Sequence, residues 1–89
     1  MPNIKSAAKR ARQNIKRENR NRRIKSMLKT SIRRFEESLQ SGDHEDSGSR
    51  LHIAVRQIDK AVTKGILHKN TAARKKSRLS RLFNNSAAV

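Results

Sequence analysis

The first third of the chain is rich in side chains that bind phosphate. Residues 1–34 contain thirteen lysines and arginines and a single acid, Glu18. Lysine offers a mobile point charge to phosphate oxygens, and arginine adds paired donors in a rigid fork. Interleaved asparagines and Gln13 can bond base edges, ribose hydroxyls or phosphate. The residues assigned to this contact are Asn3, Lys5, Lys9, Arg10, Arg12, Asn14, Lys16, Arg17, Arg20, Arg22, Arg23, Lys29 and Arg33.

The ordinary alternative for such charges is a solvated helix face. That alternative applies best where acids alternate with bases, whereas here only Glu18 is available to neutralise a cation. Unneutralised charge blocks of this size are typical of interaction arms. The whole composition agrees, because 23 Lys and Arg against 7 Asp and Glu leave a net charge of +16, which favours a polyanionic partner.

A second basic segment starts at Lys64, after a middle region in which acids outnumber bases. Residues 64–89 hold seven bases and no acid. Gly65 is expected to end one helix and Asn70 to cap the next, whose free N–H groups also favour phosphate. A tight connection with solvated charges is the alternative. The phosphate-binding residues predicted here are Lys64, His68, Lys69, Asn70, Arg74, Lys75 and Arg78.

No set of residues points to catalysis, a metal or a cofactor. The chain has no cysteine, and its three histidines lack the helical spacing of metal ligands. His52 and Asp59 share one predicted helix face, but no substrate pocket is expected beside them. The only aromatic residues, Phe35 and Phe83, lie on apolar stripes, which excludes recognition by aromatic stacking. We expect a non-enzymatic chain that binds RNA through phosphate, ribose and the shape of the RNA fold.

Helical signals dominate the chain, because proline occurs only at position 2 and the turn signals of hairpins are missing. Gly42 and Gly65 stand where periodic segments stop, as left-handed residues at helix ends do. The sequence predicts three helices, over residues 6–40, 47–63 and 71–84. The N-cap candidates for the second helix are Asp46, Ser47 and Ser49, and those for the third are Asn70 and Thr71.

Each predicted helix carries one apolar stripe with three- and four-residue spacing. The first stripe is Ile24, Leu28, Ile32, Phe35 and Leu39, with Met27 alongside. The second is Leu51, Ala54, Val55, Ile58, Ala61 and Val62, and the third is Ala72, Leu79, Leu82 and Phe83. Ile53 falls outside its stripe, either exposed or in a second contact. Three such stripes can close on each other, so the expected fold is all-α, a three-helix bundle with a long protruding N-terminal helix.

The first predicted helix changes its apolar side along its length. Ala7, Ala8, Ala11 and Ile15 lie nearly opposite the stripe that begins at Ile24. A straight helix cannot pack both sides against one bundle, so the front half is expected to protrude. The resulting organisation is a single domain over residues 1–89. It comprises a basic arm (1–22), a three-helix bundle (23–84) and a tail (85–89).

Two stretches resemble the bacterial and plastid small-subunit ribosomal protein twenty (S-twenty) family. One is Asn3-Ile4-Lys5-Ser6-Ala7 with Lys9-Arg10, and the other is Lys64 to Asn70 followed by Ala72-Ala73-Arg74. The spacing between them also matches, so the likeness covers nearly the whole chain. It implies a three-helix bundle buried in 16S ribosomal RNA of the small subunit, where it stabilises the folded RNA. Ala8 departs from the family, which commonly has a lysine at that position.

Other classes of cationic protein remain as alternatives. A DNA-packaging (nucleoid-type) protein would use the same charges but bind duplex DNA and structured RNA about equally. A membrane-active helix needs bulky apolar residues opposite its charges, whereas the arm offers alanines and Ile15. A transit peptide is also rich in arginine and poor in acids, but it would not explain the basic residues after position 64. We expect a cytoplasmic, ribosome-bound protein with no membrane, small-molecule or homo-oligomeric partner and no cofactor.

Overall fold

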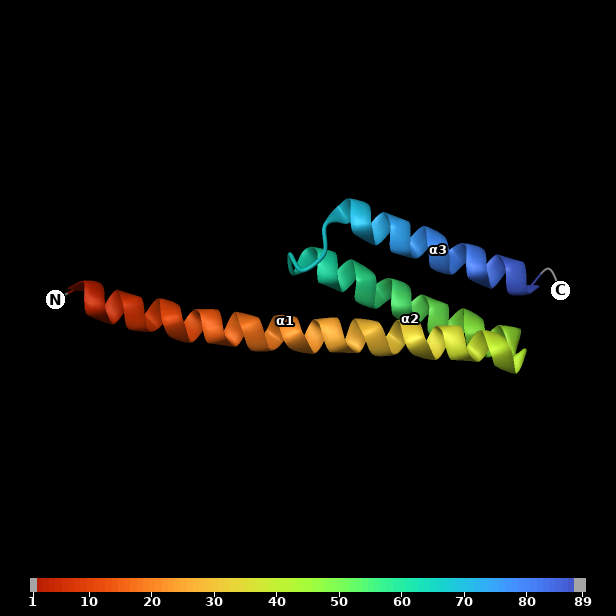
Figure 1. Cartoon of the computed structure of the whole chain (residues 1–89), viewed down its shortest axis with the longest axis horizontal. Helices are drawn as coiled ribbons and strands as arrows, with labels where there is room; N and C mark the ends of the chain where they lie inside the picture. Colours follow the sequence, from red (N-terminus) through yellow and green to blue (C-terminus); the bar gives the residue numbers. More distant parts are fainter. Residues whose placement is uncertain (1, 88–89) are drawn as a thin grey trace.

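The computed structural model describes the backbone of residues 2–87 and the side chains of residues 4–86. These residues form three helices and no strand: α1 (Pro2–Ser41), α2 (His44–Thr63) and α3 (Lys69–Ala87). α2 runs antiparallel to α1 and to α3, and the first half of α1 extends beyond the other two helices (Figure 1). The expected all-α bundle with a long protruding N-terminal helix is confirmed.

The molecule is elongated. Its principal extents are 68 × 23 × 13 Å and its radius of gyration is 17.8 Å, against about 12 Å for a compact domain of this length. The 40 residues of α1 account for the length, because an α-helix rises about 1.5 Å per residue. α1 begins at Pro2 rather than near Ser6 as predicted, since proline suits the first turn, where an N–H has no helical acceptor.

The turn between α1 and α2 is shorter than predicted. Gly42 has a φ of +79°, as expected for the left-handed residue after a helix. The Asp43 side chain then accepts a hydrogen bond from the Asp46 N–H at 3.1 Å and caps α2. The expected caps Asp46, Ser47 and Ser49 were therefore wrong. Acids in the first turn of a helix stabilise it, so α2 begins earlier in the sequence than predicted.

The α2–α3 connection is a compact Schellman turn. Gly65 has a φ of +75°, its N–H bonds the Val62 carbonyl at 3.0 Å, and the Ile66 N–H bonds the Ala61 carbonyl at 2.8 Å. Ile66 and Leu67 pack against the core. α3 continues past the predicted end at residue 84, where no glycine or proline interrupts it.

The start of α3 corrects the sequence prediction. α3 begins at Lys69, so Asn70 and Thr71 are helical residues and neither is the N-cap. His68 caps the helix instead, with its Nδ1 accepting a hydrogen bond from the Asn70 N–H at 3.1 Å. The imidazole nitrogen thereby satisfies one of the free N–H groups of the first turn.

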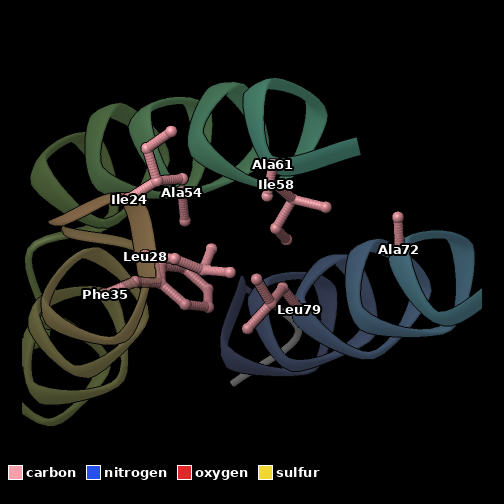
Figure 2. Packing of buried hydrophobic residues seen from close by; sticks show 8 residues of the cluster. All are labelled: Ile24, Leu28, Phe35, Ala54, Ile58, Ala61, Ala72 and Leu79. Atoms are coloured by element: carbon pink, nitrogen blue, oxygen red, sulfur yellow. The ribbon is translucent and has the colours of Figure 1, made fainter. Parts of the chain in front are cut away.

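The core is small and is shared by all three helices. Figure 2 shows side chains of each helix pointing toward a common interior, among them Phe35, Ile58 and Leu79. Among the side chains that the structure describes, Phe35 and Ile58 are the large ones that are fully buried. The buried residues of the cluster are Ile24, Leu28, Phe35, Ala54, Ile58, Ala61, Ala72 and Leu79. Each belongs to a predicted stripe, and Ile53 is exposed.

α2 is the central element of the bundle, because its backbone packs closely against both α1 and α3, whereas α1 and α3 scarcely approach each other. Near the turn end, the buried hydroxyl oxygens of Ser38 and Ser47 lie 3.2 Å apart across the α1–α2 contact. Small side chains at this point allow the two helices to approach closely. The arm, by contrast, is unpacked, and residues 4–20 are all exposed.

Candidate nucleic-acid interface

The arm presents its cations to solvent without neutralising them. Among the described side chains, no arm lysine or arginine pairs with an acid, and Glu18 makes no ion pair. The predicted residues of this part whose side chains are described and exposed are Lys5, Lys9, Arg10, Arg12, Asn14, Lys16, Arg17 and Arg20. Asn3 lies in α1, but its side chain is outside the described residues. This region can therefore meet a polyanion without first breaking internal contacts.

The arm has one strongly basic side and one side of small and aliphatic residues. Lys9, Lys16, Arg20 and Arg23 recur at seven-, four- and three-residue steps, which places them along one side of α1. The opposite side includes Ile4 and Ile15, which are 68% and 57% exposed. We use the name basic side for the face that runs from Lys9 to Arg23.

The basic side ends in a pocket where the arm leaves the bundle. The cavity has a volume of about 340 Å³ and is lined by the aliphatic side chains of Ile24 and Met27 and by four cations. The cations are Arg20, Arg23, Lys60 and Lys64. No acid lines this corner pocket, so its four charges raise the local positive potential where they converge.

The corner pocket joins residues from the two segments that the sequence indicated separately. Arg20 and Arg23 come from the first segment and Lys64 from the second, and the antiparallel pairing of α1 with α2 brings them together. Lys60 was not predicted, because it lies in the region where acids outnumber bases. Its spacing of four residues from Lys64, the C-cap of α2, was the available signal.

Other predicted cations of α1 face elsewhere. Arg22 and Lys29 line a separate groove of about 360 Å³ together with Lys25, Ser26 and Thr30. Arg33 pairs with Glu37 at 3.8 Å, and both side chains are 69% exposed. Such an exposed pair contributes little stability, so Arg33 can exchange it for another anion. The predicted first segment therefore divides between at least two faces of α1.

The second segment begins at the end of the bundle from which the arm extends and continues along the first half of α3 (Figure 1). Lys64, His68, Lys69, Asn70, Arg74 and Arg78 are exposed, and Lys75 is half-buried. His68 differs from the others, because its Nδ1 is already used as the cap of α3. The structure thus assigns His68 a structural task beside its predicted contact with RNA.

The exposed acids and histidines form no catalytic arrangement in the described part of the chain. Asp59 accepts a hydrogen bond from Lys76 Nζ at 2.8 Å, so it ties α2 to α3 instead of facing His52. Across residues 4–86, no three His, Asp or Glu side chains gather in a way that suits a metal ion. None of the described helices combines the length and apolar character needed to cross a membrane.

Comparison with known proteins agrees with this picture of a cationic, non-catalytic surface. The family model described as Ribosomal protein S20 matches residues 2–84. Small ribosomal subunit protein bS20 of Pelotomaculum thermopropionicum is 63% identical over 84 residues, which cover 94% of this chain and 96% of that protein. The protein of the same name from Natranaerobius thermophilus is 54% identical over 88 residues, covering 99% and 100%.

A relative of lower identity also matches nearly the whole chain. Small ribosomal subunit protein bS20 of Cutibacterium acnes is 46% identical over 88 residues, which cover 99% of this chain and all of that protein. The resemblance seen in the two basic segments therefore extends through the acidic middle region and the whole bundle. The chain belongs to the Ribosomal protein S20 family, a family of structural ribosomal proteins and not of enzymes.

Proposed function

We propose that the protein is a structural component of the small ribosomal subunit in the bacterial cytoplasm, where it binds 16S ribosomal RNA through phosphate contacts. The observation that carries this proposal is the unneutralised charge of the arm and the corner pocket. The arm is exposed over residues 4–20, and four cations without an acid line the corner pocket. The names of the bacterial relatives support the assignment to the small subunit.

The mechanism is stabilisation of one folded form of the RNA. RNA segments that approach each other repel through their phosphates, and a rigid cationic helix between them reduces this repulsion. Because the protein binds only the folded arrangement, its binding free energy is added to the stability of that arrangement. The predicted residues of both segments act here mainly on phosphate and ribose, which position the protein on the RNA.

Salt-dependent binding tests the proposal. The full chain is titrated onto a 16S ribosomal RNA transcript at several salt concentrations, with duplex DNA as a competitor. Replacing Lys9 and Arg12 by Gln should reduce the slope of log affinity against log salt by about 1.4 to 1.8, since each phosphate contact contributes about 0.7 to 0.9. The matched control is Lys76→Gln with Arg81→Gln on α3, which removes the same charge outside the proposed residues and should leave the slope nearly unchanged. Because it also breaks the exposed Lys76–Asp59 ion pair between α2 and α3, a circular dichroism melt checks that the bundle is intact.

Two results would contradict the proposal. An unaltered slope in the Lys9→Gln, Arg12→Gln variant would remove those residues from the interface. Equal affinity for duplex DNA and for the ribosomal transcript would instead support a DNA-packaging protein.

A further inference from the structure

A row of adjoining cavities runs along the side of the bundle that α1 and α2 form, and one of these cavities is lined by α2 alone. Four cavities succeed one another in this row, and each shares residues with the next: Lys60, then Ile53, then the pair Arg34 and Arg50. No described residue of α3 lines any of the four. We call this feature the α1–α2 groove, and its cations are Arg20, Arg23, Arg34, Arg50, Arg56, Lys60 and Lys64.

The floor of the groove holds apolar surface that the core does not use. Met27 is 43% exposed and Ile53 is 49% exposed, and each lines one or more of the four cavities. Ile53 is also the residue that fits no predicted apolar stripe. Ile24 also lines the corner pocket but is buried, so the exposed aliphatic side chains of the groove are Met27 and Ile53, with cations along its edges.

Negative charge is confined to one end of the groove. Glu37 and Asp46 line only the cavity nearest the α1–α2 turn, and Asp46 is already bonded to Arg50 at 3.0 Å. The other three cavities contain no acid among their lining residues. From the corner pocket to Arg34, the charged residues that line the groove are thus all cations.

The groove also continues the basic side of the arm. Arg20, Arg23, Met27 and Arg34 follow at three-, four- and seven-residue steps on α1, so they extend the line that begins at Lys9. On α2, Ile53, Arg56 and Lys60 follow in the same manner toward the corner pocket. One cationic track therefore runs from the arm through the corner pocket and along the bundle.

We propose that a second stretch of RNA sugar–phosphate backbone lies in the α1–α2 groove, beyond the arm contact. Arg34, Arg56 and Lys60 bind its phosphates, and Met27 and Ile53 lie against ribose carbons. This inference rests on the function proposed above. It adds Arg34 from the first segment, and Arg56 and Lys60 from the middle of the chain, where acids outnumber bases. A partner helix is disfavoured as the occupant, because it needs a continuous exposed apolar stripe in the groove, whereas the exposed aliphatic side chains there are the two separate residues Met27 and Ile53.

Removing two charges from the groove tests the inference. Arg56 and Lys60 are exposed, and neither forms an ion pair among the described residues. In the full chain, Arg56→Gln with Lys60→Gln should reduce the salt slope of binding to the 16S transcript by about 1.4 to 1.8. The Lys76→Gln, Arg81→Gln variant removes the same net charge and should bind nearly as the original chain does. Circular dichroism melts of both variants check that the bundle is intact.

The outcomes separate this inference from the proposed function. If the original chain binds and the arm variant weakens binding, but the groove variant behaves like the α3 control, the groove inference fails and the function stands. If the original chain does not prefer the ribosomal transcript to duplex DNA, both fail. A reduced slope in the groove variant alone, with the control unchanged, supports the inference.

A local probe provides a second measurement that needs no change of charge. The chain has no cysteine, so Ile53→Cys creates a unique attachment point on the groove floor for a chelated iron that generates hydroxyl radicals. Ser80→Cys, exposed on α3, is the matched control. Ile53→Cys should cleave a set of 16S nucleotides distinct from those cleaved from Ser80→Cys. If the chelate at Ile53→Cys cleaved the RNA no more strongly than the free reagent does, the groove would face solvent or a protein partner. That result would overturn the inference.

Discussion

At the scale of single residues, two glycines differ in whether their positions tolerate a side chain. Gly42 has a φ of +79° at the end of α1, a conformation that L-residues with a side chain rarely adopt. Gly48 lies inside α2, and a Cβ built there would be 3.5 Å from the Phe83 ring, an ordinary van der Waals contact. The Phe83 ring also stacks on His44, with centroids 4.4 Å apart. Gly48 is therefore compatible with a small side chain, and Gly42 is not.

Replacing each glycine by alanine should change stability in opposite directions. Gly48→Ala should raise the free energy of unfolding by about 0.5 to 1 kcal/mol, because alanine loses less conformational freedom in a helix. Gly42→Ala should lower it by about 1 to 2 kcal/mol, because its left-handed conformation brings Cβ close to a carbonyl oxygen. Urea unfolding followed by circular dichroism measures both. A destabilised Gly48→Ala protein would show that the Phe83 ring cannot accommodate the added methyl group.

At the scale of the helices, α1 consists of two physically different halves. From Ile24 onward its apolar stripe is buried against α2 and α3, whereas residues 4–20 make no packing contact that buries them. In the arm, cations follow one another at four-residue spacing, as in Lys5 with Lys9 and Arg12 with Lys16. Like charges at this spacing destabilise a helix. The arm helix consequently depends on a partner more than the rest of the molecule does.

Hydrogen exchange measures this dependence. In the free protein, backbone amides of residues 4–20 should exchange much faster than those of residues 54–61, because tertiary packing protects only the latter. Adding the 16S transcript should slow exchange over the arm and leave the core segment nearly unchanged, as expected for a segment that is ordered on binding. If the arm were already as protected as the core in the free protein, its helix would not depend on RNA.

At the scale of the whole molecule, the chain has a net charge of +16, and Phe35 and Ile58 are the only fully buried large side chains in its described part. Such an imbalance favours expansion through self-repulsion, and small domains have little apolar burial to oppose it. If the proposed contacts form, RNA phosphates also supply the counter-charge that this chain lacks.

Salt should therefore act in opposite directions on stability and on binding. Raising sodium chloride from about 50 mM to about 200 mM shortens the range of repulsion, so the thermal midpoint of the free protein should rise. Over the same range the affinity for the transcript should fall steeply, because fewer counterions are released. Scanning calorimetry and filter binding give the two trends. A midpoint indifferent to salt would show that self-repulsion does not limit the free fold.

The sequence alone determined most of the secondary structure and the composition of the core. Three- and four-residue spacing identified the buried stripes, and Gly42 and Gly65 marked two helix ends, because helical periodicity and left-handed conformations are local properties. It failed at Asp43 and His68. The segment beginning at Asp43 is rich in Ser, Gly and acids, and the predicted second helix began only at residue 47. Yet Asp43 caps α2 and the ring of Phe83 lies against Gly48. His68 takes the capping place expected of Asn70.

Tertiary structure decided which cations meet. The sequence predicted the basic residues of both segments, but it could not place Arg20 beside Lys64 or assign Arg34, Arg56 and Lys60 to one groove. Those neighbours depend on how α2 is rotated and shifted against α1, which is set by packing between side chains distant in sequence. Charge counted along the chain made the middle region mildly acidic. In the folded protein, however, the middle region supplies Arg56 and Lys60, which line one side of a cationic groove that has almost no acids.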